Sequence, residues 1–181
     1  MGKIRIAVVT ARFNTEITQK LEEGAISYLE ACPDVEIFSA LVPGAVEIPL
    51  VAQAFLEAGC DGIVALGAVV RGETSHYDYV CSSVTDGITR LMLDYKKPIG
   101  FGVLTTENEE QALARAGGKH GNKGEEAAQV VMEMIGLTHE IPAAIRTADL
   151  EIKMAATKAK TKKTAPAAKK ATAQKKTKKK K

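Results

Sequence analysis

The sequence predicts an α/β protein with three α/β/α layers and a four-stranded parallel sheet in the middle layer. Short runs rich in β-branched residues alternate with longer segments whose apolar residues recur at helical spacing, which is typical of β-α units. The short runs are apolar along their whole length, so helices should cover both faces of the sheet. A chain of 181 residues with 45% hydrophobic content is sufficient for one such domain.

Four strands are expected, at residues 4–9, 35–42, 63–70 and 99–105. Asn14 is suited to cap the start of a first helix, and Gly59 is suited to end a second. A third helix, at about 80–92, should stop before Pro98. Two further helices are expected at about 109–116 and 123–135, with a glycine-rich linker between them.

Charge divides the chain into two parts. Residues 153–181 hold 13 Lys and no acidic residue, which leaves residues 1–152 with 12 basic and 22 acidic residues, a balance of 12 − 22 = −10. We therefore expect a folded domain at 1–138, an extension at 139–154 whose structure the pattern does not assign, and a disordered Lys/Ala-rich tail at 155–181. The tail is a solubilising appendage, a terminal extension without a role, or a nonspecific, salt-dependent contact for polyanions.

The cysteines and the N-terminus indicate a cytoplasmic protein. Cys32, Cys60 and Cys81 have no C-x-x-C spacing, so the sequence predicts neither a disulfide framework nor a zinc cluster. His120 and His139 lie in unrelated contexts, and no metal site is expected. The N-terminus has no signal-peptide pattern, and no apolar stretch approaches the ~20 residues that cross a bilayer.

Four informative loops should meet at one edge of the sheet. Right-handed β-α-β connections place the carboxyl ends of parallel strands together, where open α/β sheets bind ligands. The segments that follow the strands are "TARFN", "VPGAVEIP", "RGETSHYDY" and "TTEN". Arg71, the Thr74 hydroxyl and loop N–H groups are suited to a small phosphate, and His76 is suited to proton transfer near neutral pH.

Each of these segments also has a purely structural interpretation. Phe13 could close the core at a helix start, and "PGAVEIP" could be a simple turn into a helix. His76 could be a helix-start residue that faces solvent. Taken singly, the motifs leave both interpretations open.

Five segments together resemble the lumazine synthase family in order and spacing, across roughly residues 3–137. They are "ARFN", "VPGAVEIPL", "ALGAVVRGETSHYDYV", "PIGFGVLTTENEEQALARAG" and "GNKGEEAA". The resemblance implies a flavodoxin-like fold of the lumazine synthase type. It also implies a transferase that condenses 5-amino-6-(D-ribitylamino)uracil with 3,4-dihydroxy-2-butanone 4-phosphate to 6,7-dimethyl-8-ribityllumazine, the penultimate step of riboflavin biosynthesis. No cofactor and no metal are implied.

The resemblance also implies roles for individual residues. His76 matches the histidine that transfers protons, and Phe13 matches the aromatic residue that stacks on the pyrimidine, with Asn14 beside it. The other implied substrate-binding residues are Ala45, Val46, Glu47, Ala68, Val69, Val70, Phe101 and Lys123, and the implied phosphate-binding residues are Gly72, Glu73, Thr74 and Arg115. Lys119 and Glu126 match an ion pair of the family.

A homo-oligomer follows from the same resemblance. Phe101 and Arg115 match positions that a neighbouring subunit contributes, so sites at subunit interfaces and at least a pentamer are implied. The linker "RAGGKHGNKG" is similar to that of members that form a 60-subunit icosahedral capsid. The segment before the first strand is shorter than in those members, so pentamer and shell both remain open.

Three hypotheses about function follow. The first is an active lumazine synthase. The second is a binding protein for lumazine or flavin that kept the fold and lost the reaction. The third is a cage or scaffold that acts through its assembly or its basic tails. The presence of every motif residue favours the enzyme.

Overall fold

The computed structural model describes the backbone of residues 2–163 and the side chains of residues 2–154. Its sheet is parallel and four-stranded in the order β2-β1-β3-β4, which confirms the predicted strands and their direction. The strands are β1 (Ile4–Ala11), β2 (Val35–Val42), β3 (Gly62–Val70) and β4 (Ile99–Thr106). β1 and β4 extend slightly beyond their predicted ends, so the site loops begin later than expected.

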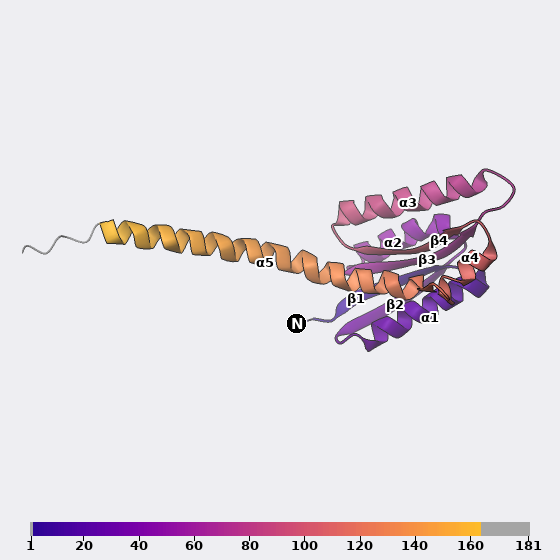
Figure 1. Cartoon of the computed structure of the whole chain (residues 1–181), viewed down its shortest axis with the longest axis horizontal. Helices are drawn as coiled ribbons and strands as arrows, with labels where there is room; N and C mark the ends of the chain where they lie inside the picture. The colour runs from indigo at the N-terminus through magenta and orange to yellow at the C-terminus, as the bar shows by residue number, and fades with distance from the viewer. Residues whose placement is uncertain (1, 164–181) are drawn as a thin grey trace, which may run out of the picture. The chain divides into compact units, whose positions relative to one another are not determined.

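Helices form a layer on each face of this sheet (Figure 1). One face carries α1 (Thr15–Ala31), α4 (Glu109–Leu113) and the first part of α5 (Lys123–Lys163), and the other carries η1 (Ala45–Glu47), α2 (Ile48–Glu57) and α3 (His76–Tyr95). Each layer buries its own apolar cluster, around Leu21 and Val131 on one side and Ile48 and Ile88 on the other. The three-layer prediction is therefore confirmed.

The expectation that both faces of every strand are covered holds for β1 and β3 but not for β2. β1 and β3 are almost wholly buried from Ile6 and Gly62 onward, whereas exposed and half-buried residues alternate along β2. Phe38 and Leu41 are exposed, the latter at 62%. Because β2 is an edge strand, the helices of one chain do not reach all of its surface.

Two local predictions were wrong in detail. Asn14 precedes α1 in a left-handed conformation with φ 59°, but its side chain makes no capping hydrogen bond. The predicted glycine-rich linker between α4 and α5 contains β5 (Ala116–Gly118) and β6 (Gly121–Asn122), which pair as a small antiparallel hairpin. α4 ends at Leu113, before the predicted boundary, since the chain turns into this hairpin.

The chain separates into two compact units, residues 1–139 and 140–181. α5 is assigned as one helix from Lys123 to Lys163, so the extension at 139–154 is helical and so is the backbone of residues 155–163. The helix thus includes the start of the tail that we expected to be disordered, and residues 164–181 of that tail lie outside the described residues. Within the described part of the chain, no helix has the length and apolar character needed to span a membrane.

Two glycines of α5 provide a matched test of how the helix packs. A Cβ at Gly124 would overlap the main chain of Leu21 in α1, whereas a Cβ at Gly136 would meet nothing within 4 Å. We expect Gly124→Ala to lower the free energy of unfolding by about 1–3 kcal/mol through overpacking. Gly136→Ala should raise it by about 0.5–1 kcal/mol, because alanine favours the helix. Urea unfolding of both variants checks the two signs, and a loss at Gly136 would contradict the described packing.

Candidate active site

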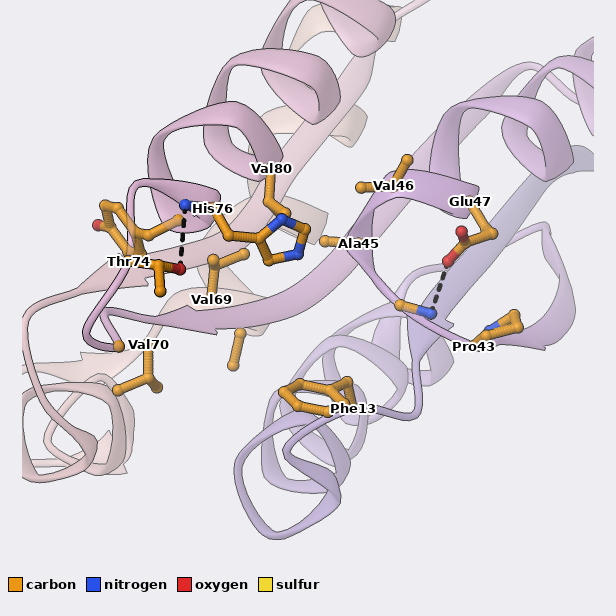
Figure 2. A pocket seen from close by; sticks show the side chains of 14 residues that line it. Phe13, Pro43, Ala45, Val46, Glu47, Val69, Val70, Thr74, His76 and Val80 are labelled. Atoms are coloured by element: carbon orange, nitrogen blue, oxygen red, sulfur yellow. Dashed lines mark hydrogen bonds between the residues drawn. The ribbon is translucent and has the colours of Figure 1, made fainter.

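The carboxyl ends of β1, β2 and β3 surround a pocket of about 640 Å³ (Figure 2). Most of the predicted substrate residues line it, together with four that the sequence did not single out, Pro43, Gly44, Tyr77 and Val80. The predicted residues that line it are Phe13, Ala45, Val46, Glu47, Ala68, Val69, Val70, Gly72, Thr74 and His76. A pocket of this size and largely apolar character suits a small organic ligand.

Phe13 presents an aromatic face at the mouth of this pocket. The ring is 70% exposed, so the interpretation that it closes the core is wrong. The backbone that carries the ring is anchored, since the main-chain N–H of Phe13 donates to the Pro43 carbonyl at 3.1 Å. A flat apolar face fixed in this way can stack against a planar ring.

The turn after β2 forms the opposite wall. The Glu47 carboxylate accepts a hydrogen bond from the Gly44 N–H at 2.9 Å, and this bond closes the turn before η1 and α2 begin (Figure 2). Ala45 and Val46 then face the pocket from within the turn. The turn is therefore both a helix start and a wall of the site.

Asn14 links the ends of β1 and β3 instead of capping α1. Its side-chain amide donates to the Ala68 carbonyl at 2.8 Å. The β1–β3 ladder ends at the pair Thr10 and Leu66, so Ala68 has no strand partner on the β1 side. On the β1 side, the main-chain groups of β3 beyond this point can meet a ligand, except for the carbonyl that Asn14 occupies, whereas the groups directed at β4 stay paired with that strand.

His76 lies at the first residue of α3, and its imidazole points into the pocket (Figure 2). The main-chain nitrogen of His76 lies 3.4 Å from the Thr74 hydroxyl oxygen, and this hydrogen bond connects the helix start to the preceding loop. Val80 and Val69 flank the ring in the same view. Among the described residues that line the pocket, the titratable side chains are those of Glu47, His76 and Tyr77.

Only part of the loop at 71–74 faces the pocket. Gly72 and Thr74 line the pocket, but Glu73 does not. The Arg71 guanidinium, which the sequence suggested for an anion, is paired with the carboxylates of Asp78 and Glu107 in this structure. Burial raises the pKa of the Tyr77 hydroxyl, which keeps this lining residue neutral well above neutral pH.

Phe101, Arg115 and Lys123 lie away from the pocket in this chain. Phe101 is exposed near the start of β4, at the end of the strand opposite the site. Arg115 lines a separate hollow of about 390 Å³ with Lys119 and His120. The Lys123 N–H donates to the Arg115 carbonyl at 2.9 Å, so these two residues stay together. The predicted Lys119–Glu126 ion pair is wrong, because Glu126 pairs with Lys123 at 2.6 Å.

The pocket offers shape, main-chain polar groups and one imidazole. Among the residues that the structure describes, no lysine, cysteine or serine lines the pocket, so this part of the chain provides no amine or thiol nucleophile to the wall. The three cysteines are free, and burial raises the pKa of the Cys60 and Cys81 thiols, which disfavours a thiolate at either residue. Within the described side chains, no group of His, Cys, Asp and Glu is arranged to hold a metal ion. Such a wall suits a reaction in which one substrate supplies the nucleophile, the other supplies the electrophile, and the imidazole transfers protons between them.

Comparison with known proteins decides the family. Residues 3–139 match the family described as 6,7-dimethyl-8-ribityllumazine synthase. The chain belongs to the lumazine synthase family. It is an enzyme with lumazine synthase activity, and this activity is a step of riboflavin biosynthesis.

Three relatives described as 6,7-dimethyl-8-ribityllumazine synthase illustrate the range of similarity. The protein of Bdellovibrio bacteriovorus is 82% identical over 158 residues, covering 87% of this chain and 88% of its own. Those of Pediococcus pentosaceus and Helicobacter pylori are 53% and 48% identical, covering 77% and 75% of this chain and 92% and 89% of their own. An alignment of 158 residues must continue well past His139, so the Bdellovibrio lumazine synthase shares part of the helical extension.

Proposed function

We propose that the pocket at the ends of β1, β2 and β3 is where 5-amino-6-(D-ribitylamino)uracil condenses with 3,4-dihydroxy-2-butanone 4-phosphate. The observation that carries this proposal is the meeting of Phe13, the 44–47 turn and His76 in one pocket. An aromatic face, a polar turn and a proton carrier are the groups that a ring, a ribityl chain and a condensation require.

The pyrimidine substrate occupies the β1 and β2 side of the pocket. Its ring stacks on Phe13, and its polar edge meets the end of β3 at Ala68, Val69 and Val70, where the main-chain groups of Ala68 and Val70 face away from β4. The ribityl hydroxyls contact the turn at Ala45, Val46 and Glu47. The Glu47 carboxylate already accepts from Gly44 through one oxygen, which leaves the other oxygen for a hydroxyl donor.

The phosphate-bearing substrate occupies the loop side. Gly72 and Thr74 line this side, and Glu73 lies between them, outside the lining. The amine of the pyrimidine attacks the ketone and an imine forms with loss of water, so both reacting groups come from the substrates. Elimination of phosphate, ring closure and dehydration then need a group that gives and takes protons, and His76 is placed for that role.

The assembly is part of this proposal, because a single chain leaves the site incomplete. Arg115, Lys123 and Phe101 match family site residues but lie away from their own pocket. We place them against the pocket of a neighbouring copy, in a ring of at least five subunits. The exposed apolar residues of edge strand β2, Phe38 and Leu41, support burial against another chain. Sedimentation velocity separates pentamer from shell, and a purely monomeric, fully active protein would contradict the shared site.

The test of the proposed reaction is direct. Purified protein is mixed with both substrates, and lumazine formation is followed by absorbance and fluorescence against a protein-free control. The expected result is acceleration that disappears when the four-carbon substrate lacks its phosphate. Binding of the lumazine product without acceleration would instead favour a binding protein that has lost the reaction.

The basic tail has a separate proposed role in nonspecific contact with polyanions. Thirteen lysines without an acidic residue at 153–181 support it, and the absence of aromatic residues there argues against base recognition. We expect deletion of residues 155–181 to abolish binding of a single-stranded DNA oligonucleotide at about 50 mM salt. A full-length variant with glutamine in place of the lysines at 158–181 serves as the control for length. DNA binding that survives both changes would show that the tail does not have this role. Lumazine formation should be the same in both variants as in the parent protein.

A further inference from the structure

Arg71 connects three parts of the chain around the phosphate-side loop. It is the first residue after β3, and its N–H donates to the Thr106 carbonyl at the end of β4 with a length of 2.9 Å. Its Nε lies 2.8 Å from a carboxylate oxygen of Glu107, and its Nη2 lies 3.1 Å from one of Asp78. The centre of the guanidinium lies 4.0 Å from the centroid of the Tyr77 ring. These four residues, Arg71, Tyr77, Asp78 and Glu107, form what we call the Arg71 cluster.

The Arg71 cluster differs from other ion pairs of this protein. Those of Lys20, Arg90 and Lys123 each span three or four residues of one helix and reinforce only that helix. Arg71 instead joins the end of β3 to the first turn of α3 and to the segment after β4. The planar guanidinium can do this because it has several donors in a fixed fork and a face for the aromatic ring.

The cluster closes the loop that carries the site residues. Gly72, Thr74 and His76 all lie between Arg71 and its partner Asp78, and all three line the pocket. Gly72 has open space around it, and Glu73 and Thr74 are exposed, so packing within the loop does little to fix its path. The contacts of Arg71 with Asp78 and Tyr77 bring the two ends of the loop together and leave its middle turned toward the pocket.

We propose that Arg71 is a positioning residue for the phosphate-bearing substrate, acting through Glu107, Asp78 and Tyr77 rather than by binding the substrate. This inference rests on the proposed function of the pocket. It assigns the specificity for phosphate partly to a residue outside the pocket wall. It also explains why a cation directly beside the loop does not serve as the anion's partner, since two carboxylates already neutralise it.

The competing explanation is that Arg71 leaves its carboxylates and binds the phosphate itself. The two explanations predict opposite effects of Glu107→Gln. If Arg71 positions the loop, loss of the Glu107 charge loosens the loop and raises the KM for the phosphate-bearing substrate. If Arg71 binds the phosphate, the same change frees the guanidinium and lowers that KM.

The experiment measures steady-state kinetics with each substrate varied in turn, and the binding of inorganic phosphate by calorimetry. We expect Arg71→Gln to raise the KM for the phosphate-bearing substrate roughly tenfold and to weaken phosphate binding to a similar degree. Glu107→Gln should give a smaller increase, and Arg71→Lys should recover part of the loss. The KM for the pyrimidine should change by less than about twofold, because Phe13 and the 44–47 turn are untouched.

Arg90→Gln is the matched control. It removes an arginine–carboxylate pair from the same helix as Asp78, but Arg90 lies on a different groove and not on this pocket. Its kinetics should equal those of the parent protein. If Arg71→Gln fails to assemble, Glu107→Gln, which leaves the Arg71–Asp78 contact in place, carries the test.

The outcomes separate the possibilities. A lower KM in Glu107→Gln, an unchanged KM in Arg71→Gln, or equal losses for both substrates would each overturn the positioning role. Inorganic phosphate binding does not depend on turnover, so its weakening in Glu107→Gln supports the positioning role independently of the rate assay, whereas tighter phosphate binding in that variant would overturn it. An inactive parent protein would count against the proposed reaction instead.

Discussion

Arg115→Ala should lower kcat/KM for the phosphate-bearing substrate on the order of a hundredfold, the size expected when one partner of a desolvated charge pair is removed. Pyrimidine binding should change little. Arg115 lies in a hollow with Lys119 and His120, and its Nη1 donates to the Gln111 carbonyl at 2.9 Å, which holds the guanidinium in one direction. A planar cation fixed in this way is suited to a phosphate that approaches from a neighbouring subunit.

Lys119→Ala provides the control for this prediction, because it removes a positive charge from the same hollow without touching the guanidinium. If both variants lost activity equally, general positive charge would account for the effect and the assignment of Arg115 would fail. Equal losses for the two substrates in Arg115→Ala would also count against it. The measurement is steady-state kinetics with each substrate varied separately.

His76→Ala should lower kcat by about 10²–10⁴, the usual contribution of a positioned acid–base group. Binding of the lumazine product should stay close to that of the parent protein, because Phe13 and the turn at 44–47 remain. Some activity should survive, since the condensation joins two groups that react with each other. The pH dependence of kcat should also become flatter in the variant.

His139→Ala is the matched control for His76→Ala, since it changes a histidine outside both the pocket wall and the hollow that holds Arg115. A parent protein and a His76→Ala variant with the same pH profile would remove His76 from proton transfer. A large loss of product binding in His76→Ala would indicate that the imidazole shapes the pocket rather than moves protons.

The two variants together test the shared site. If His76 and Arg115 act from different subunits, subunits of the two variants refolded together should recover activity that neither has alone. With random mixing, about a quarter of the interfaces would carry both native residues. No recovery in assemblies shown to be mixed would mean that both residues serve the same chain's pocket.

Strong hydrophobic patterning made the fold predictable. The four strands lie close to their expected positions because β1 and β3 are buried on both faces and therefore read as continuous apolar runs. The same reasoning placed Phe13, the 44–47 turn and His76 at one edge, where the structure brings them together. Parallel connections alone determine which edge that is.

Contacts between distant side chains were not predictable in this way. Asn14 is a residue type that often caps helices, yet its side-chain amide donates to the Ala68 carbonyl. This carbonyl lies next to Asn14 only once the sheet has formed. The sequence suggested that Arg71 binds an anion, but it could not show that Glu107, from the segment after β4, lies beside the guanidinium. Periodicity also carried little information for α5 beyond residue 139, because residues 140–154, whose side chains the structure describes, are all exposed and no buried face imposes a pattern there.

The early end of the β1–β3 ladder has a consequence for selectivity among ring compounds. Because strand residues alternate in direction, Val70 points its main-chain groups to the same side as Ala68, toward the space that β1 has left. Asn14 takes the Ala68 carbonyl, so the remaining N–H and C=O groups present one fixed sequence of donors and acceptors. A ring analogue whose polar edge has donors and acceptors in the reverse order would leave these N–H and C=O groups without hydrogen-bond partners, because the bound ring excludes water from them. The enzyme would thus reject wrong rings by main-chain geometry, which exchange of side chains cannot easily alter.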